Sequence, residues 1–381
     1  MFPTRAMTVL GGDSFRDEWS MTFDGTNDYI DCGTALGTTL GANYAGDLSV
    51  SIWFKANAMS GGMFQVGKHN YGEFSLRLDS DELMLSLNNT GWDMKVAFAD
   101  TGSWNHVVGV LTVGTEGTSL LYLNGVSVGT SSGSFPLASA MDMNEGSAII
   151  GKVHNDEFNG NISEAAIYNT ALTASQVATI YNGREPYNHK EGIAAGNLKG
   201  WWRMGDGQID ARSGESTGII SDEASGGSYL GPQLLTNGDF TNWTGGGGGN
   251  PDNWTVTGES GIDPAISQSS GKARMVCGNG NDIYIHQAIC TIGKVYYWEV
   301  EITSRTSGSI LLETGEGTSI QGSLNSAQVW NGYFIADHAS VRIRRTGGSD
   351  VDLIFDNAII KEVVGGYPGI MENMAQNDFV V

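Results

Sequence analysis

The sequence contains little cysteine, and the few cysteines present form no recognisable motif. Three of the 381 residues are cysteines, and none lies in the C-x-x-C or Cys/His spacing of a metal site. An odd number of cysteines argues against a disulfide framework. Cys277 and Cys290 flank a short hairpin pattern, so a disulfide bond between these two remains an alternative. We expect free, reduced thiols rather than a fold stapled by disulfides.

Basic residues and long apolar runs are also scarce. The chain has 20 Lys and Arg against 42 Asp and Glu, which gives a formal net charge of −22. Such a surface repels nucleic acids and anionic membranes. No stretch is long enough to span a bilayer, and the N-terminal segment lacks the continuous apolar run of a signal peptide. We expect a soluble protein, not exported by the usual route, with no nucleic-acid or membrane partner.

Catalytic motifs are missing too. No H-E-x-x-H or G-x-S-x-G pattern occurs, and the six histidines are scattered along the chain. Retaining glycosidases need two carboxylates close together. The nearest candidates are Glu299 and Glu301 on one strand face, and a solvated face explains them because no third acid follows. The sequence therefore predicts a protein that is not an enzyme.

Glycine and period-two alternation are abundant. The 55 glycines, with many Ser, Thr and Asn, give a turn-dense composition that is typical of short strands. Residues 48–54 and 296–302 each alternate apolar and other side chains, as a half-buried strand does. The predicted fold class is all-β, with two antiparallel jelly-roll β-sandwiches joined by a polar linker.

Two local signals are sharp. In "TASQVATIY", Thr173 and Gln176 have the spacing of a helix capping box, so one short helix is expected there, at an end of the first sandwich core. The dipeptide Asn124-Gly125 predicts a tight hairpin turn.

Composition shifts divide the chain into five parts. The predicted parts are an N-terminal arm (1–19), a first sandwich (20–207), a linker (208–232), a second sandwich (233–364) and an irregular C-terminal tail (365–381).

Several motifs of the first sandwich resemble the laminin-G-like, concanavalin-A-type jelly roll. They are the W-x-H-V pattern at 104–107, L-Y-x-N-G at 121–125, the stretch Phe158–Glu164, and the I-Y-N-x-A-L turn at 167–172. The resemblance covers about residues 20–183. It implies a fold, in which His106 is a packing residue, and it does not imply one function.

The second sandwich resembles carbohydrate-binding-module jelly rolls. The motifs are "LLTNGDFTNWT" at its start and "DLIFDNAIIKEV" at its end. Such modules often hold a structural Ca²⁺ between a carboxylate near the first strand and an aspartate in the last. The resemblance places Asp356 in the second role and Asp239 in the first, because Thr241 stands where the usual acid is found.

The order of the parts resembles structural proteins of tailed marine bacteriophages. The stretches "GWWRMGDG" (200–207) and "MENMAQND" (371–378) carry this resemblance. It implies a non-enzymatic virion protein, used for capsid decoration or in a fibre or tail, that is made in the host cytoplasm. Its partners would be other virion proteins and copies of itself.

Two alternatives stay open. One is an adhesin that binds host surface glycans, and the other is a glycan depolymerase. Aromatic side chains beside polar groups can stack on sugars, although the same aromatics serve equally as core or interface anchors. The glycan-binding candidates are Tyr71, Trp92, Asp93, Trp243, Trp254 and Trp330.

Apolar residues near the linker and in the tail are candidate interface residues. On a strand, Trp201 and Trp202 point to opposite faces, so one enters the core and the other faces the linker, the second sandwich or another subunit. We expect the termini to become ordered by docking on another subunit, because apolar residues on unstructured ends need a partner surface. In the tail these residues are Met371, Met374 and Phe379.

Overall fold

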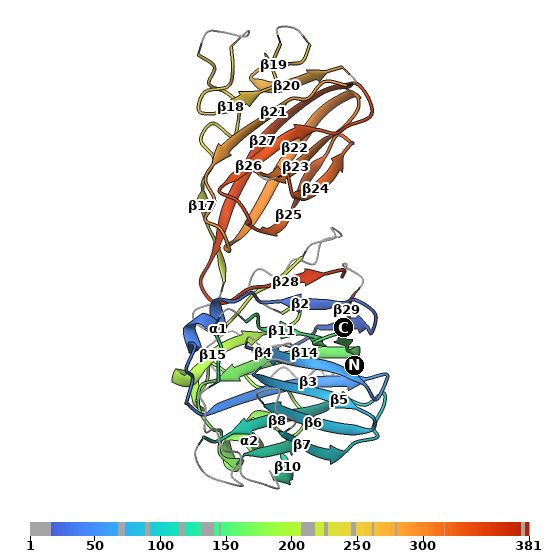
Figure 1. Ribbon diagram of the computed structural model, residues 1–381, viewed down its shortest axis with the longest axis vertical. Helices are drawn as coiled ribbons and strands as arrows, with labels where there is room; N and C mark the ends of the chain where they lie inside the picture. The colour runs from blue at the N-terminus through green and yellow to red at the C-terminus, as the bar shows by residue number, and fades with distance from the viewer. Residues whose placement is uncertain are drawn as a thin grey trace, which may run out of the picture. The chain divides into compact units, whose positions relative to one another are not determined.

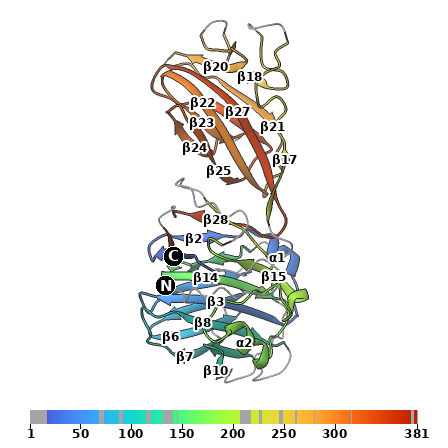
Figure 2. The same cartoon turned by 180° about the vertical axis from the view of Figure 1, so that it is seen from behind.

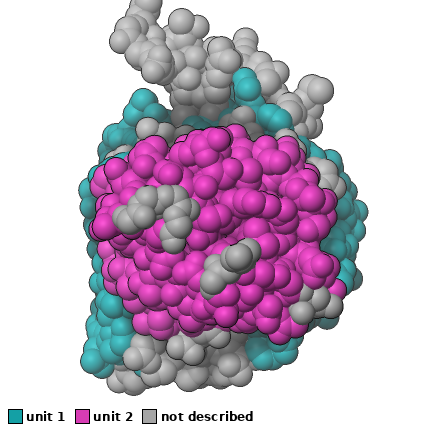
Figure 3. All heavy atoms as spheres, turned by 90° about the horizontal axis from the view of Figure 1, so that it is seen from above, with its two compact units in different colours: residues 1–229, 365–381 teal, residues 230–364 magenta. Residues whose placement is uncertain are grey.

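The computed structural model describes residues 17–380 except 68–72, 88–91, 114–118, 131–140, 145, 207–217, 225–227, 245–248, 261–262, 279, 316 and 375–377. Across these residues the protein is almost entirely β, as predicted, with strands in four sheets (Figure 1). The chain forms two compact units, coloured separately in Figure 3: residues 1–229 with 365–381, and residues 230–364. Within the described residues, no helix has the length and apolar character needed to cross a membrane.

Unit 1 is a sandwich of two sheets, which we call A and B. All strand pairs in them are antiparallel except that of β13 with β4. Sheet A has the order β10 (Val126–Thr130), β9 (Leu120–Leu123), β8 (Asn105–Leu111), β3 (Leu48–Ala56), β14 (Asn159–Tyr168), β1 (Ser20–Asp24), β29 (Phe379–Val380), with β15 (Leu198–Trp202) beside β14. Sheet B has the order β16 (Ile219–Ile220), β28 (Gly369–Glu372), β2 (Tyr29–Asp31), β11 (Ile149–Ile150), β4 (Gly61–Val66), β5 (Phe74–Asp79), β6 (Glu82–Leu87), β7 (Trp92–Ala97), with the hairpin β12 (Lys152–Val153) and β13 (Asp156–Glu157) beside β4.

Alternation along the strands builds the core between sheets A and B. The side chains of Leu48, Val50, Ile52 and Phe54 on β3 are all buried in it, as the sequence predicts. The predicted tight turn is also present, because both Asn124 and its following glycine have positive φ between β9 and β10.

The predicted helix is α2 (Ala174–Tyr181), and its capping box is confirmed. The Thr173 hydroxyl accepts from the backbone N–H of Gln176, and the Gln176 side chain accepts in return from the N–H of Thr173. Instead of closing an end of the main core, α2 covers a separate apolar cluster on the other face of sheet A, to which Val177 and Ile180 contribute. A second short helix, α1 (Ala35–Leu40), was not predicted.

The two adjacent tryptophans of β15 point to opposite faces of sheet A and both are buried. Trp202 lies in the main core, and Trp201 lies in the cluster under α2. The expectation that one of them faces the linker is met by Trp201: its backbone N–H donates to Asp222 of the predicted linker, and Ala224 packs against the same cluster. A contact of either tryptophan with another subunit stays a prediction.

The C-terminal segment differs most from expectation. It was predicted to be irregular and to dock on another subunit, yet it forms β28 beside β2 in sheet B (Figure 2) and β29 in sheet A (Figure 1). Met371, Met374 and Phe379 are buried in the core of unit 1. Apolar residues of the tail do have a partner surface, but it belongs to the same chain. The predicted linker also contributes β16, which pairs with β28.

Unit 2 is a second antiparallel sandwich. Its sheet C has the order β19 (Ala265–Ser269), β20 (Lys272–Cys277), β27 (Val351–Val364), β22 (Val295–Ser307), β25 (Val329–Ile335), with β17 (Tyr229–Gln233) beside β27. Its sheet D has the order β18 (Thr255–Thr257), β21 (Tyr284–Ala288), β26 (Ser340–Arg345), β23 (Ile310–Thr314), β24 (Ser319–Leu324). The predicted inward row of Tyr296, Trp298, Val300 and Ile302 is buried between the sheets.

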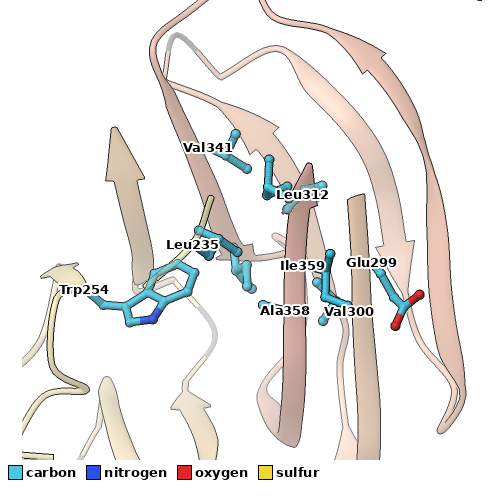
Figure 4. A pocket seen from close by; sticks show the side chains of 10 residues that line it. Leu235, Trp254, Glu299, Val300, Leu312, Val341, Ala358 and Ile359 are labelled. Carbon is cyan, nitrogen blue, oxygen red and sulfur yellow. The ribbon is translucent and has the colours of Figure 1, made fainter. Parts of the chain in front are cut away.

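A small cavity lies inside unit 2 between its two sheets. Its lining is mostly aliphatic, and the Trp254 indole borders it while the Glu299 carboxylate points away (Figure 4). Its volume is about 10 Å³, roughly the space that one water molecule needs. It is therefore a packing defect of the core rather than a ligand site.

All three cysteines are free and buried. The bridge between Cys277 and Cys290 that the sequence left open is not formed. Burial raises the pKa of both thiols above the ordinary value, which keeps them protonated and unreactive.

Candidate functional site

A serine and a histidine lie within hydrogen-bonding distance in unit 1, but their burial makes them structural. Ser51 Oγ is 2.8 Å from His106 Nε2, and the imidazole packs against the rings of Trp53 and Tyr181, with centroid distances of 4.9 and 5.9 Å. Burial lowers the pKa of His106 to about 3, so the ring is neutral. His106 is thus the packing residue that the resemblance implied, and no substrate reaches the serine, which is fully buried.

A second buried histidine belongs to the loop that follows α2. The Tyr168 hydroxyl hydrogen-bonds His189 Nδ1, and the imidazole meets the Trp201 ring edge-on with 5.4 Å between centroids. Burial lowers the pKa of His189 to about 3. This pair also closes the cluster under α2 and offers no reactive group to solvent.

Two carboxyl groups of unit 1 share a buried site. Asp17 hydrogen-bonds Glu164, which also accepts from the Trp201 indole N–H and pairs with Arg203 at 3.1 Å. Burial, then the charge of Glu164, raises the pKa of Asp17 well above its ordinary value, and burial raises that of Glu164. The pair ties the start of the described chain to sheet A. Because Glu164 is fully enclosed, this is an anchor and not a catalytic dyad.

The tryptophans proposed as sugar platforms in unit 2 are committed to its core. Trp254 is buried, stacks on Phe240 and donates its indole N–H to the Asn237 carbonyl. Trp243 and Trp330 are half-buried, pack against the same core and each donate to a backbone carbonyl. The structure favours their role as core anchors.

The acidic residues proposed as Ca²⁺ ligands have protein partners. Asp356 pairs with Lys272 at 3.2 Å, and Asp239 accepts from the Thr241 hydroxyl at 3.1 Å. Across the part of the chain that the structure describes, no three His, Cys, Asp or Glu side chains are grouped as a metal site needs. Calcium binding between Asp239 and Asp356 stays a prediction.

The carboxylates of Glu299 and Glu301 lie on the outer side of sheet C. Glu299 accepts from the Tyr297 hydroxyl at 2.6 Å, and Glu301 accepts from the Asn357 amide at 2.6 Å. These partners fit the structural interpretation of the pair, a polar strand face.

Of the glycan-binding candidates of unit 1, Tyr71 lies outside the described residues. Trp92 and Asp93 begin β7, and the register pairs Trp92 with Leu87 and Asp93 with Ser86.

A polar row crosses sheet B on the face opposite the core. Gln65 of β4, Ser75 of β5, Ser86 of β6 and Asp93 of β7 are consecutive cross-strand partners. Residues directly opposite each other share a face. Their neighbours Phe74, Leu76, Leu85 and Leu87 point into the core. We call this set of four the serine row.

A second row runs parallel to the serine row on the same face. It consists of Gly62, Arg77, Met84 and Lys95. Arg77 lies 4.0 Å from Asp79, and Lys95 lies 3.7 Å from Glu82. The Lys95 side chain is solvent-exposed, so the accessible part of this row is basic.

The serines of the serine row are buried without hydrogen-bond partners. Ser75 is 1% exposed and Ser86 is 8% exposed, and neither hydroxyl has a partner among the described residues. Buried polar groups normally have a partner. Two adjacent exceptions on one sheet face mark a place where a ligand can supply the missing hydrogen bonds.

The hairpin β12–β13 bounds the serine row on one side. The backbone N–H of His154, at the hairpin turn, donates to Gln65 Oε1 at 2.9 Å. Gly62 allows the close approach, since a side chain there would collide with Val153. The hairpin is fastened by an ion pair of 2.8 Å between Lys152 and Glu157.

The sequence marked Tyr71, Trp92 and Asp93 as the candidates of this region, and not the strand serines. Alternation along β5 and β6 places Ser75, Arg77 and Ser86 opposite the core residues Leu76 and Leu85. Because a serine on a strand face is usually solvated, the pattern alone does not single these serines out.

Comparison with known families identifies the domain that carries this face. Residues 24–178 match the concanavalin A-like lectin/glucanases superfamily, in its laminin-G form. This match covers most of unit 1 up to α2 and includes every strand of the serine row. A comparison with curated proteins finds no match.

Several solved structures are distantly similar to part of the chain. A SAP-like pentraxin from Limulus polyphemus is 21% identical over 45% of this chain and 85% of its own, with a TM-score of 0.35. A putative carbohydrate-binding protein from Bacteroides ovatus is 14% identical over 58% and 62%, with a TM-score of 0.37. The CBM40 of a Ruminococcus gnavus sialidase, bound to α2,3-sialyllactose, is 16% identical over 42% and 96%, with a TM-score of 0.35.

Proposed function

We propose that the protein binds carbohydrate without cleaving it, on the sheet B face that holds the serine row. The observation that carries this proposal is the pair of buried, unpartnered serine hydroxyls beside Gln65. The family match supports carbohydrate as the ligand, because the superfamily description names both lectins and glucanases. A polyhydroxylated ligand is the natural complement of a row of hydroxyl and amide groups.

The energetics favour a ligand at this position. A buried polar group without a partner costs about 1–3 kcal/mol, and the serine row holds two such groups side by side. A sugar hydroxyl both donates and accepts, so it can satisfy a serine whatever the orientation of the serine hydroxyl. Since both serines are nearly covered, binding requires that the side chains over them move aside.

The burial of one carboxyl pair supports binding rather than cleavage. Asp17 and Glu164 are enclosed on sheet A, and Glu164 is paired with Arg203. This pair lies on sheet A, whereas the serine row lies on sheet B, so the pair is separated from any ligand bound at the serine row. A reducing-sugar assay on every glycan that binds tests this part of the proposal, and release of new reducing ends contradicts it.

The decisive variants are Ser75→Ala and Ser86→Ala. Neither hydroxyl has a hydrogen-bond partner among the described residues, so the free energy of unfolding should stay unchanged or rise slightly. Each variant should weaken glycan binding by about tenfold, the effect of one lost hydrogen bond of about 1.4 kcal/mol. Binding is measured on a glycan array with the full chain, followed by titration of the best ligand.

Ser49→Ala is the matched control. Ser49 is also a buried strand serine, but its hydroxyl donates to the Thr170 carbonyl at 2.8 Å and accepts from Leu172 N–H at 3.0 Å. This variant should lose stability and keep its glycan affinity. If no glycan binds the wild-type chain, or if both serine variants bind normally, the proposal is wrong.

The virion role predicted from the sequence stays a prediction. A glycan-binding protein and a virion protein are compatible, since an adhesin is displayed on a particle surface. Mass spectrometry of purified virions tests it: the chain should copurify with particles at a fixed stoichiometry.

A further inference from the structure

Unit 2 has a long, regular sheet edge at β25. Among the described residues, β25 ends the strand order of sheet C and pairs with β22 alone. The ladder between these two fully described strands runs from Val295 opposite Ile335 to Glu301 opposite Val329 without a register break. Such an edge presents a row of backbone N–H and C=O groups to any strand that lies beside it.

The backbone groups of alternate residues on β25 point to this edge. The Gln328 carbonyl before the strand and the Ala336 N–H after it each form a hydrogen bond of 2.9 Å to β22 or to the residue directly before β22. Successive residues of an antiparallel strand turn their backbone groups to opposite sides. Even-numbered residues of β25 therefore bond to β22, whereas the backbone groups of odd-numbered residues, such as Val329 and Ile335, point away from it.

Features that block a sheet edge are present on other strands but not on β25. Natural proteins protect edges with very short strands, charged residues, proline or register breaks. The strands at the other ends of the four sheets each have one of these features: register breaks in β10 and β24, two or three residues in β16, β18 and β29, Lys95 on β7, and Pro264 directly before β19. β25 has seven residues, with no proline and no charge, so its edge is left open to pairing.

Exposed apolar side chains gather at β25. Val329 and Ile335 are exposed at the two ends of the strand, on the outer side of sheet C. Ile292 is also exposed, and it lies in the turn whose Gly293 N–H donates to the Ala336 carbonyl at 2.7 Å. These are three of the five exposed large apolar residues in the described part of the chain. Apolar groups that cluster at a surface mark an interaction site.

The order of side chains on β25 is symmetric about Gly332. Outward from this glycine in both directions, the strand V-W-N-G-Y-F-I gives a polar group, then an aromatic ring, then a β-branched apolar side chain. A two-fold interface is self-complementary, since residue i of one copy meets residue j of the other and j meets i. Two antiparallel copies of β25 with their axis at Gly332 place Val329 opposite Ile335 at both ends. The odd-numbered residues, whose backbone groups face the edge, then form the hydrogen-bonded pairs.

Charge permits this contact although the chain is strongly acidic. A net charge of −22 opposes the close approach of two copies unless the contact itself is uncharged. On the outer side of sheet C, one row across the contact reads Glu301 and Val329, then Ile335 and Val295 of the second copy. No carboxylate meets another in this row, because β25 contributes only uncharged residues.

We infer that β25 is an interaction surface for a second copy of this chain, which pairs with it edge to edge and antiparallel about a two-fold axis at Gly332. Sheet C then continues through both copies, and Val329 and Ile335 lose their exposure to water. An unrelated strand needs only the backbone groups, whereas the symmetric order of side chains favours a second copy. This inference goes beyond the proposed function, because it concerns assembly and needs no glycan.

The test is sedimentation equilibrium of the full chain from about 1 to about 100 µM, which brackets the micromolar dissociation constants of small interfaces. The mass of wild type should rise from that of the monomer toward twice that value. Val329→Lys and Ile335→Glu should each weaken the dimer by about tenfold, since each dimer holds the altered pair twice. Val329→Lys combined with Ile335→Lys should weaken it further, because like charges then oppose each other.

Val329→Lys combined with Ile335→Glu tests the register. The two new charges lie at opposite ends of one strand, but across the two-fold axis each meets the opposite charge of the other copy. This chain should therefore dimerise more strongly than either single variant. The rescue is specific to an antiparallel pairing centred on Gly332.

Val126→Lys is the matched control. Val126 is an exposed apolar residue on the edge strand β10 of unit 1, and its replacement should leave the dimer unchanged. All substituted side chains are exposed, and a thermal unfolding curve of each variant checks that it folds.

Three results overturn the inference: a wild-type chain that stays monomeric, a dimer that Val329→Lys with Ile335→Lys leaves intact, or no rescue by Val329→Lys with Ile335→Glu. None of these measurements involves a glycan. Their failure therefore leaves the proposed function standing, and failure of glycan binding leaves the dimer standing.

Discussion

At the scale of single residues, buried polar side chains hold together segments of unit 1 that lie apart in the sequence. Asp222 is fully buried, and its carboxylate accepts from the backbone N–H groups of Trp201, Ala224 and Tyr367, each at 2.8 Å. These three donors lie far apart in the sequence. One side chain therefore joins β15, the segment after β16 and the chain that enters β28.

Replacing Asp222 with alanine should destabilise unit 1 by on the order of 3 kcal/mol, because three buried N–H groups lose their acceptor. Urea unfolding should show an earlier transition for unit 1 and an unchanged one for unit 2. Asp239→Ala, at an exposed aspartate, is the control and should have little effect. An Asp222→Ala chain with wild-type stability would show that water replaces the carboxylate.

The Asp17 and Glu164 pair predicts a dependence on pH. A carboxyl whose folded-state pKa is raised gives stability that is present below its ordinary pKa of about 3.9 and is lost as pH rises through the folded value. Arg203 and Asp206 also face Asp17, and their charges act in opposite directions. In Asp17→Asn the side-chain amide can still donate a hydrogen bond to Glu164, but residue 17 no longer has a carboxyl group to titrate.

The melting temperature of unit 1 in wild type should therefore fall relative to Asp17→Asn as pH increases from about 4 to about 8. The measurement is a pair of thermal scans at each pH. A constant difference between the two chains across that range contradicts a shared proton at this site.

At the scale of elements, long alternating patterns were predictable and short ones were not. The rows of β3 and β22 and the cap of α2 follow from local sequence, because each contains its own period or capping pair. β28 and β29 have four and two residues, so neither has a readable period. Their strand character comes from partners near the N-terminus, β2 and β1, which no local signal identifies. The serine row was readable from alternation, but the missing hydrogen bonds that mark it required coordinates.

The importance of β28 is testable with one core substitution. Met371 is 1% exposed, and Met371→Ala should cost about 2–5 kcal/mol of unit 1 stability, since it leaves a cavity between the sheets. Val126→Ala, at a 65% exposed strand residue, should change stability by less than about 0.5 kcal/mol. Equal effects in chemical denaturation would mean that β28 does not belong to the folded core.

At the scale of the whole molecule, unit 2 is an insertion in unit 1. The sequence suggests two sandwiches in tandem, because their patterns follow one another along the chain. The structure instead returns the chain to unit 1 after residue 364. The segment that leaves unit 1 and the segment that returns to it lie side by side. β17 pairs with β27, and the Ser228 hydroxyl donates to the Gly365 carbonyl at 3.0 Å.

This topology predicts that unit 2 can be removed without unfolding unit 1. Replacing residues 230–364 with a short Gly/Ser linker should leave a chain with a cooperative thermal transition. A chain that ends at residue 207 should not fold stably, because it lacks β16, β28 and β29. Circular dichroism melting curves of the two chains decide the matter. A stable fragment of residues 17–207 would contradict the account.

The central claim is that sugars bind on the sheet B face at the serine row. The most direct measurement is a crystal structure of the full chain with the tightest-binding oligosaccharide from the array. We expect sugar hydroxyls within hydrogen-bonding distance, about 2.7–3.2 Å, of Ser75 Oγ and Ser86 Oγ. A sugar held elsewhere on unit 1, with both serine hydroxyls still unpartnered, would contradict the claim.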